Sequence, residues 1–200
     1  MEARHETDPR TPDEIRRQLA TQLQIDDWHL AAIPIPVLNR LRDQLAIDEL
    51  TGVLSRRAGL FALTSAIERV RRSAAPELAL VFLDVDGLKF INDTQGHAAG
   101  DAALRSVADA LKRCLRAGDI VFRYGGDEFV CALPHLKPES AGELLLEAWR
   151  QLQGQSGQCF SAGFAELRHE DDEWRLIARA DECLFAGRRG DRRRESRFAS

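Results

Sequence analysis

The stretch that decides the fold is Ile120-Val-Phe-Arg-Tyr-Gly-Gly-Asp-Glu-Phe-Val-Cys-Ala-Leu133. Two short apolar runs are separated by a pair of glycines, which predicts two strands joined by a tight turn, a β-hairpin. Glycines permit positive φ and let a phosphate approach the backbone N–H groups closely. Asp127 and Glu128 follow directly, and carboxylates beside a phosphate-binding turn favour a metal ion between the anions. Taken alone, Gly-Gly-Asp is also compatible with an ordinary hairpin turn.

A second charged site follows the apolar run Leu78-Ala-Leu-Val-Phe-Leu83, which predicts a central strand buried on both faces. Asp84 and Asp86 are expected just past the end of this strand, where a crevice outside the sheet can form. Two carboxylates this close resist burial unless a cation compensates them. Oxygen ligands without a nearby His or Cys favour Mg²⁺ or Mn²⁺ over Zn²⁺. A surface turn is the alternative interpretation of Asp-x-Asp.

Strand and helix patterns alternate from Asp48 onward and predict a layered α/β or α+β domain over residues 48–200. Residues 1–47 form a leader and a short helical extension. The extension is predicted to contain a helix from Pro12, an extended break at Ile33-Pro-Ile-Pro36, and a second helix from about Val37 whose apolar stripe suits a core face or a dimer seam. Further helices are expected from Ser55, at Gly96 to Leu115, at about 138–153 and at 173–187, with strands at 158–165 and 196–199.

Composition excludes several classes of protein. The 200 residues are 44% hydrophobic and 30% charged, which is typical of a globular domain and excludes collagen-like, disordered and multi-span membrane chains. A net charge of −4 argues against coating nucleic acid, and no apolar signal segment is evident, so we expect a cytoplasmic protein with neither a nucleic-acid partner nor membrane insertion. The widely spaced cysteines are predicted to be reduced core thiols: Cys114, Cys131, Cys159 and Cys183.

Several separately placed motifs agree in order with those of one known family. They are Asp48-Glu-Leu-Thr-Gly52, Leu83-Asp-Val-Asp-Gly-Leu-Lys89, Ile91-Asn-Asp93, Gly96-His97, Gly100-Asp101, Arg123-Tyr-Gly-Gly-Asp-Glu-Phe129, Ser161-Ala-Gly163 and Ala180-Asp181. On these residues the chain resembles the GGDEF domains, the family of diguanylate cyclases. The resemblance implies a fold like the palm of nucleotide cyclases and polymerases, with a central, largely antiparallel sheet flanked by helices. It also implies that two GTP condense to cyclic di-GMP and two pyrophosphates between the two domains of a homodimer.

The resemblance assigns roles to individual residues. Asp84, Asp127 and Glu128 match the catalytic carboxylates and metal ligands, with the Val85 carbonyl as a main-chain ligand; Glu128 could instead activate the 3′-hydroxyl. Phosphoryl transfer relies on such metals, Mg²⁺ or Mn²⁺ here, to neutralise charge and orient oxygens. The remaining GTP-binding positions are Asn92 and Asp101 for guanine, the main chain of Gly87, Leu88, Gly125 and Gly126 for phosphates, and the side chains of Lys89, Arg188 and Arg192 for phosphate charge.

A control site is implied as well. Arg116-Ala-Gly-Asp119 precedes Gly125 by six residues, which matches the family's inhibitory R-x-x-D site for the product cyclic di-GMP. An arginine fork suits a guanine edge or a phosphate. The same four residues also suit a helix C-terminus, with Gly118 ending the helix and Arg116 near its dipole.

Some positions depart from the family pattern. Ser55 replaces the usual Asn, Leu88 the usual Phe, and Gly187-Arg188 the common Ala-Lys, so affinity for the triphosphate is the property most affected. None of these positions is a metal ligand. The alternative function is a non-catalytic GGDEF-like module that binds GTP or cyclic di-GMP and signals to a partner. The intact Gly125 to Phe129 favours the enzyme.

Overall fold

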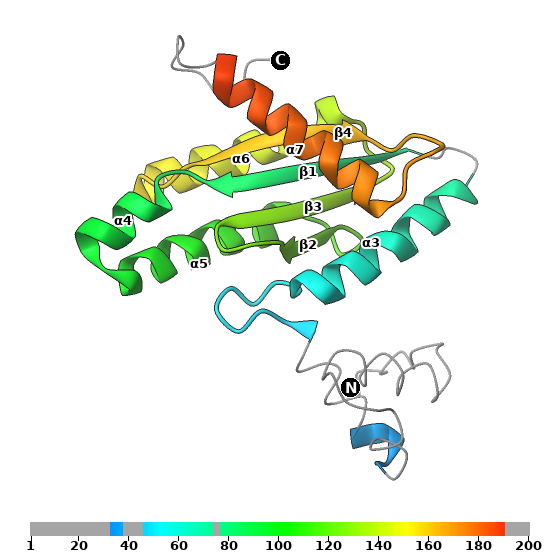
Figure 1. Ribbon diagram of the computed structural model, residues 1–200, viewed down its shortest axis with the longest axis horizontal. Helices are drawn as coiled ribbons and strands as arrows, with labels where there is room; N and C mark the ends of the chain where they lie inside the picture. Colours follow the sequence, from blue (N-terminus) through cyan, green and yellow to red (C-terminus); the bar gives the residue numbers. More distant parts are fainter. Residues whose placement is uncertain (1–32, 38–45, 74–76, 191–200) are drawn as a thin grey trace. The chain divides into compact units, whose positions relative to one another are not determined.

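The computed structural model describes residues 33–37, 46–73 and 77–190 (Figure 1). The chain divides into two compact units, Met1–Ala46 and Ile47–Ser200. Several predictions lie outside the described residues: the helix from Pro12, most of the helix after Val37, the strand at 196–199, and Arg192. In the first unit, Ile35, Pro36 and Val37 are helical, so the predicted extended break is wrong at Ile35 and Pro36. Proline is tolerated there because the first helical turn leaves its N–H positions unbonded in any case.

Across residues 47–73 and 77–190, the second unit forms a sheet of four strands in the order β2-β3-β1-β4. The strands are β1 (Leu78–Val85), β2 (Ile120–Arg123), β3 (Glu128–Pro134) and β4 (Phe160–Glu166). All three pairings are antiparallel, and β2 and β3 form the predicted hairpin, with Arg123 opposite Phe129. The antiparallel sheet flanked by helices is therefore confirmed.

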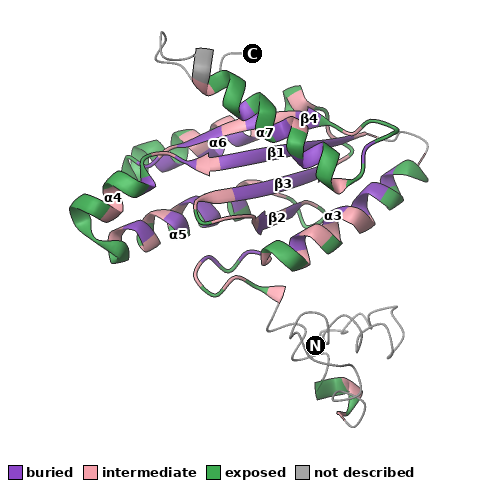
Figure 2. Ribbon diagram, viewed as in Figure 1, coloured by how far each residue is buried: buried purple, intermediate pink, exposed green. Residues whose placement is uncertain are grey.

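Helices cover both faces of the sheet in the described part of the second unit (Figures 1 and 2). Alternate residues of β1 point to opposite faces. The odd-numbered residues Ala79 to Val85 pack with α5 (His97–Cys114) and α6 (Pro138–Ser156). The even-numbered residues Leu78 to Phe82 pack with α3 (Arg56–Arg71) and α7 (Glu173–Gly190). Burial on both faces is what the continuous apolar run predicted.

Three details differ from the sequence prediction. β1 extends to Val85, so Asp84 lies inside the strand rather than beyond it. A helix that was not predicted, α4 (Leu88–Gln95), connects β1 to α5, and its N-cap Gly87 has φ +72°, a left-handed conformation that favours glycine. Cys183 is exposed on α7, so its prediction as a core thiol is wrong, whereas Cys131 is buried. Within the described ranges, no helix is both long and apolar enough to cross a bilayer.

Candidate functional site

The carboxylates predicted to act in catalysis meet where β1 ends beside the β2–β3 turn. In the antiparallel register, Asp84 lies opposite Glu128 on one side and Ser161 on the other. The Val85 N–H donates to the Asp127 carbonyl at 2.9 Å, which ties the end of β1 to the turn. The sheet thus brings Asp84, Val85, Asp127 and Glu128 to one edge, as the sequence motifs predicted.

In the hairpin turn, the backbone of one glycine, Gly125, lies very close to Glu128. The backbone N–H groups of Tyr124 and Gly125 both donate to the Glu128 carbonyl, at 2.8 and 3.3 Å. A Cβ on Gly125 would lie only 2.1 Å from Glu128 Oε2, whereas one on Gly126 would meet nothing within 4 Å. Neither glycine has positive φ, so the turn does not use the left-handed conformations that glycine permits. A side chain at position 125 would force the Glu128 carboxylate to move, because Glu128 lies against the Gly125 backbone.

The electrostatics of this edge favour a cation. Burial raises the pKa of Asp84, with Asp127 and Asp86 adding to the rise and Arg188 opposing it. Burial also raises the pKa of Glu128, and the charges of Asp127, Asp84 and Asp181 act in the same direction. Carboxylates that repel one another in this way fit the oxygen-donor chemistry of Mg²⁺ or Mn²⁺.

The described part of the chain contains no group of three or more acidic, His or Cys side chains already gathered around a metal position. The cation against the carboxylates is instead Arg188 of α7. Its Nη2 donates to Asp84 Oδ1 and lies 3.4 Å from Asp86 Oδ1. Hydrogen bonding to Asp84 raises the pKa of Arg188. Arg188, which the sequence predicted as a phosphate ligand, thus lies on the carboxylates in this structure.

A pocket of about 460 Å³ opens between α4, α5 and the hairpin turn. It brings together the residues predicted for guanine, Asn92 and Asp101, and part of the predicted phosphate site. Gly87, Gly125 and Arg188 do not line it. Its lining residues are Leu88, Lys89, Asn92, Asp93, His97, Gly100, Asp101, Leu104, Arg123, Gly126 and Asp127.

Gly100 shapes the end of this pocket that is predicted to bind guanine. A Cβ at position 100 would lie 2.0 Å from Asn92 Oδ1. The absence of a side chain therefore lets Asn92, from α4, lie against the first turn of α5 beside Asp101. An amide and a carboxylate side by side can bind the Watson–Crick edge of guanine, whose N1–H and N2–H₂ groups are donors.

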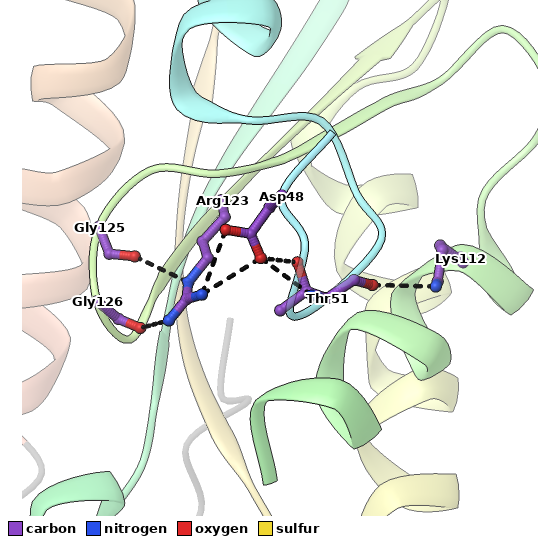
Figure 3. Close-up of polar contacts among 6 residues, drawn as sticks. All are labelled: Asp48, Thr51, Lys112, Arg123, Gly125 and Gly126. Carbon is purple, nitrogen blue, oxygen red and sulfur yellow. Dashed lines mark hydrogen bonds and ion pairs between the residues drawn. The ribbon is translucent and has the colours of Figure 1, made fainter. Parts of the chain in front are cut away.

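One guanidinium holds the hairpin turn in place (Figure 3). Arg123 Nε donates to the Gly125 carbonyl at 3.2 Å, and Nη2 donates to the Gly126 carbonyl at 2.7 Å. Its Nη1 lies 3.2 and 3.3 Å from the two carboxylate oxygens of Asp48. Asp48 also accepts from the Thr51 N–H and hydroxyl, at 3.0 and 2.7 Å. These hydrogen bonds hold the turn that carries Asp127 in one position. Arg123 also lines the pocket.

The clamp formed by Asp48, Thr51 and Arg123 continues to α5. Lys112 Nζ donates to the Thr51 carbonyl at 3.2 Å (Figure 3). Although burial opposes ionisation of Asp48, the Thr51 hydrogen bonds and Arg123 together lower its pKa. Asp48, Thr51 and Arg123 belong to the sequence motifs, but the motifs alone predicted no role for them. The sequence signal that could have indicated their ion pair is that Asp48 and Arg123 carry opposite charges and each lies in a motif that also contains glycine.

The R-x-x-D segment forms the turn between α5 and β2. The Arg116 N–H donates to Asp119 Oδ2 at 2.8 Å, and the Asp119 N–H donates to the Arg116 carbonyl at 3.0 Å. The helix ends at Cys114, with Leu115 already extended, so the alternative in which Gly118 terminates it is wrong. The Arg116 side chain is exposed beside a backbone that Asp119 holds in a tight turn.

Comparison with known proteins agrees with this geometry. The family described as "Diguanylate cyclase, GGDEF domain" matches residues 45–194. Diguanylate cyclase DosC of Escherichia coli is 36% identical over 165 residues, which cover 76% of this chain and 35% of DosC. Diguanylate cyclase DgcP of Pseudomonas aeruginosa is 36% identical over 163 residues, covering 76% of this chain and 24% of DgcP. The chain thus spans about a third or less of the length of these relatives.

A solved structure shows the same fold. The GGDEF domain of DgcB from Caulobacter crescentus, crystallised in complex with c-di-GMP, superposes with a TM-score of 0.69 at 28% identity, covering 78% of this chain and 96% of that one. The form that includes the DgcB coiled coil gives a TM-score of 0.73 at 26% identity, covering 87% and 96%. The family match, the relatives and the fold agree with the motifs around the hairpin turn, and this chain belongs to the family of diguanylate cyclase GGDEF domains.

Proposed function

We propose that the chain is a diguanylate cyclase that condenses two GTP into cyclic di-GMP with release of two pyrophosphates, and that residues 48–200 form its catalytic domain while residues 1–47 form an extension. The observation that supports this most is the position of the guanine-binding pair, Asn92 and Asp101, in one pocket with Gly126 and Asp127 of the hairpin turn. A nucleotide whose base lies against Asn92 and Asp101 would place its phosphates toward the carboxylates of Asp84, Asp127 and Glu128.

The residues of this chain perform the following tasks. Asp101 accepts hydrogen bonds from guanine N1–H and N2–H₂, which adenine lacks, so GTP is preferred over ATP. The main chain at Gly87, Leu88, Gly125 and Gly126 is proposed to contact the phosphates, and Lys89 adds positive charge. The Arg123 clamp keeps the turn in one position, so little reorganisation is needed when the nucleotide binds.

A divalent ion, Mg²⁺ or Mn²⁺, would be held by the carboxylates of Asp84, Asp127 and Glu128 and by the Val85 carbonyl. When bound, it supplies charge neutralisation at the phosphates and orientation of the attacking and leaving oxygens. The ring product contains two nucleotides, so each chain brings one GTP and the active unit is a homodimer. The substrate GTP also favours a cytoplasmic location.

We also propose that the turn at Arg116 and Asp119 binds the product and inhibits the enzyme. The exposed Arg116 guanidinium can form two parallel hydrogen bonds to a guanine edge or a phosphate. Asp119 supports this role because it accepts from the Arg116 N–H and fixes the backbone from which the side chain extends.

The test is incubation of the purified chain with GTP and Mg²⁺ and detection of cyclic di-GMP by mass spectrometry, with ATP as a parallel substrate. We expect cyclic di-GMP from GTP and no cyclic product from ATP. Asp127→Ala should lower turnover by at least about 10²-fold, because a metal ligand beside the phosphates is lost. GTP binding without any product would overturn the cyclase proposal in favour of a nucleotide-binding signalling module.

A further inference from the structure

The inference concerns the ion pair between Arg188 and the two carboxylates that flank Val85. Arg188 lies near the C-terminal end of α7 and Asp84 lies in β1, 104 positions earlier in the chain. The side chains of Asp84 and Asp86 are 19% and 18% exposed, and that of Arg188 is 36% exposed. The guanidinium therefore covers a carboxylate pair that is largely shielded from water.

The carboxylates are the fixed members of this cluster. Asp84 is part of the central strand, paired with β3 on one side and β4 on the other. Asp86 Oδ1 accepts from the Ser161 hydroxyl at 2.7 Å, and the Asp86 carbonyl accepts from Gln158 Nε2 at 3.0 Å. Arg188 reaches the pair through a long side chain with several rotatable bonds, so it is the member that can move.

A guanidinium and a divalent ion compete for the same oxygen. Arg188 Nη2 is bonded to Asp84 Oδ1. Mg²⁺ binds carboxylate oxygens at about 2.1 Å with strict geometry, and its positive charge repels a guanidinium bonded to the same oxygen. A metal that binds Asp84 through this oxygen displaces Arg188 from it, and the guanidinium then keeps only its longer contact, 3.4 Å, to Asp86 Oδ1 unless another anion is near.

We propose that Arg188 is an internal counter-ion of the metal-free site, which yields Asp84 to the metal and transfers to the nucleotide phosphates. This inference rests on the proposed function, since it takes Asp84 as a metal ligand and a nucleoside triphosphate as the ligand of the pocket. Its consequence is coupling: metal binds more weakly to the free protein than to the nucleotide complex, because the nucleotide phosphates offer the displaced guanidinium a new partner. The coupling is reciprocal, so metal also strengthens nucleotide binding.

The test is the affinity for Mn²⁺ alone, measured by electron paramagnetic resonance on the nucleotide-free protein. Arg188→Gln removes the competing charge, and we expect it to bind Mn²⁺ about three- to tenfold more tightly than the wild type, the size expected for loss of a partly exposed ion pair. Arg188→Lys keeps the positive charge but lacks the forked guanidinium, so its Mn²⁺ affinity should lie between those of the wild type and Arg188→Gln. Arg175→Gln, which changes an exposed arginine of the same helix, is the matched control and should match the wild type.

Repetition with a non-hydrolysable GTP analogue tests the coupling. The analogue should increase the affinity of the wild type for Mn²⁺ more than it increases that of Arg188→Gln. Equal Mn²⁺ affinities of the wild type and Arg188→Gln without nucleotide, or a weaker affinity of the variant, would overturn the inference. If Arg188→Gln binds Mn²⁺ more tightly but the protein makes no cyclic di-GMP, the inference holds and the proposed activity fails. If the protein makes cyclic di-GMP but the two Mn²⁺ affinities are equal, the proposed activity holds and the inference fails.

A second measurement does not depend on the folding of a neutral variant. The Nε–Hε resonance of Arg188, assigned by its disappearance in Arg188→Lys, should shift when Mg²⁺ alone is added to the wild type. It should shift again, to a different position, when the GTP analogue follows. A resonance that stays unchanged on saturation with Mg²⁺ contradicts displacement.

Discussion

Arg123 Nη1 lies within 3.3 Å of both carboxylate oxygens of Asp48, although 75 positions separate the two residues. The other nitrogens of the same guanidinium donate to the carbonyls of Gly125 and Gly126. The segment that begins the second unit is thereby joined to the turn that carries Asp127, one of the carboxylates proposed for catalysis. Both side chains are less than a quarter exposed, so solvent screens this pair only in part.

Asp48→Asn tests the clamp. The change keeps the shape of the side chain but removes the charge that Arg123 contacts, so we expect a loss of about 1–2 kcal/mol in the free energy of unfolding and a fall in cyclic di-GMP synthesis. Denaturant unfolding and product assays measure the two effects. Asp109→Asn, whose ion pair with Lys112 is exposed, serves as control and should change stability by less than about 0.5 kcal/mol. Equal stabilities of the two variants would show that the Asp48 charge is not holding Arg123.

Gly100→Ala tests the guanine end of the pocket. The new Cβ would overlap Asn92 Oδ1, so the amide must move away from Asp101, and we expect the KM for GTP to rise about tenfold or more. Steady-state kinetics over a range of GTP concentrations gives this value. Gly154→Ala, at an exposed helical position of α6 with nothing within 4 Å, should leave KM unchanged and raise stability by about 0.5–1 kcal/mol through helix propensity. An unchanged KM in Gly100→Ala would remove Asn92 from the binding site.

Glu128→Gln tests the electrostatic strain of the metal-free site. Because folding raises the pKa of Glu128, the folded protein binds this proton more tightly than the unfolded chain. The associated stability is fully present below the ordinary value of 4.5 and is lost as the pH rises through the folded pKa. The neutral amide removes that loss, so with chelator present we expect the variant to have a higher Tm than the wild type at pH 7.

The same comparison at acid pH provides the check on Glu128. The difference in Tm should shrink as the pH falls toward 4, where Glu128 is protonated in the wild type as well. Glu182→Gln, at an exposed glutamate of α7, controls for a general effect of removing negative charge. A variant that is less stable than the wild type at pH 7 contradicts the prediction.

Arg116→Ala tests product inhibition. The side chain is exposed and its backbone is held by Asp119, so the variant should fold normally and retain uninhibited turnover. We expect the concentration of cyclic di-GMP that halves the rate to rise at least about tenfold, because the loss of a bidentate contact costs about 1.5–3 kcal/mol. Rate measurements with added cyclic di-GMP provide the value. Arg113→Ala, in the last turn of α5, is the matched arginine control, and identical inhibition curves for both variants would exclude Arg116 from the product site.

The sheet was predictable from the sequence because its signals are local. The glycine-interrupted run at 120–133 predicted the hairpin, and the uninterrupted run at 78–83 predicted a strand buried on both faces. Helix α4 was missed because it is only eight residues long and its apolar residues, Leu88, Phe90 and Ile91, all lie in its first turn. Its start depends instead on the left-handed conformation of Gly87, which a single glycine does not reveal.

The contacts within the site were harder to predict than its residues. The motifs indicated Asp84, Asp127, Asn92 and Asp101, and the structure brings each pair to the expected edge or pocket. The partner of Asp84 was not predictable, since Arg188 is distant in sequence and its charge equally suits a phosphate or a carboxylate. The role of Gly125 was also hidden, because close approach of a side chain and positive φ both favour glycine.

Because β1 is buried on both faces, Asp84 also helps to specify the register of β1 against its neighbouring strands. A slip of one residue would turn every β1 side chain to the opposite face, and a run of apolar residues buried on both faces offers little resistance to such a slip. The slip would, however, turn Asp84 away from Arg188 and into the apolar layer formed with α5 and α6. The carboxylate proposed for catalysis thus also marks the alignment of the strand, so selection for activity and selection against misfolding act on the same residue.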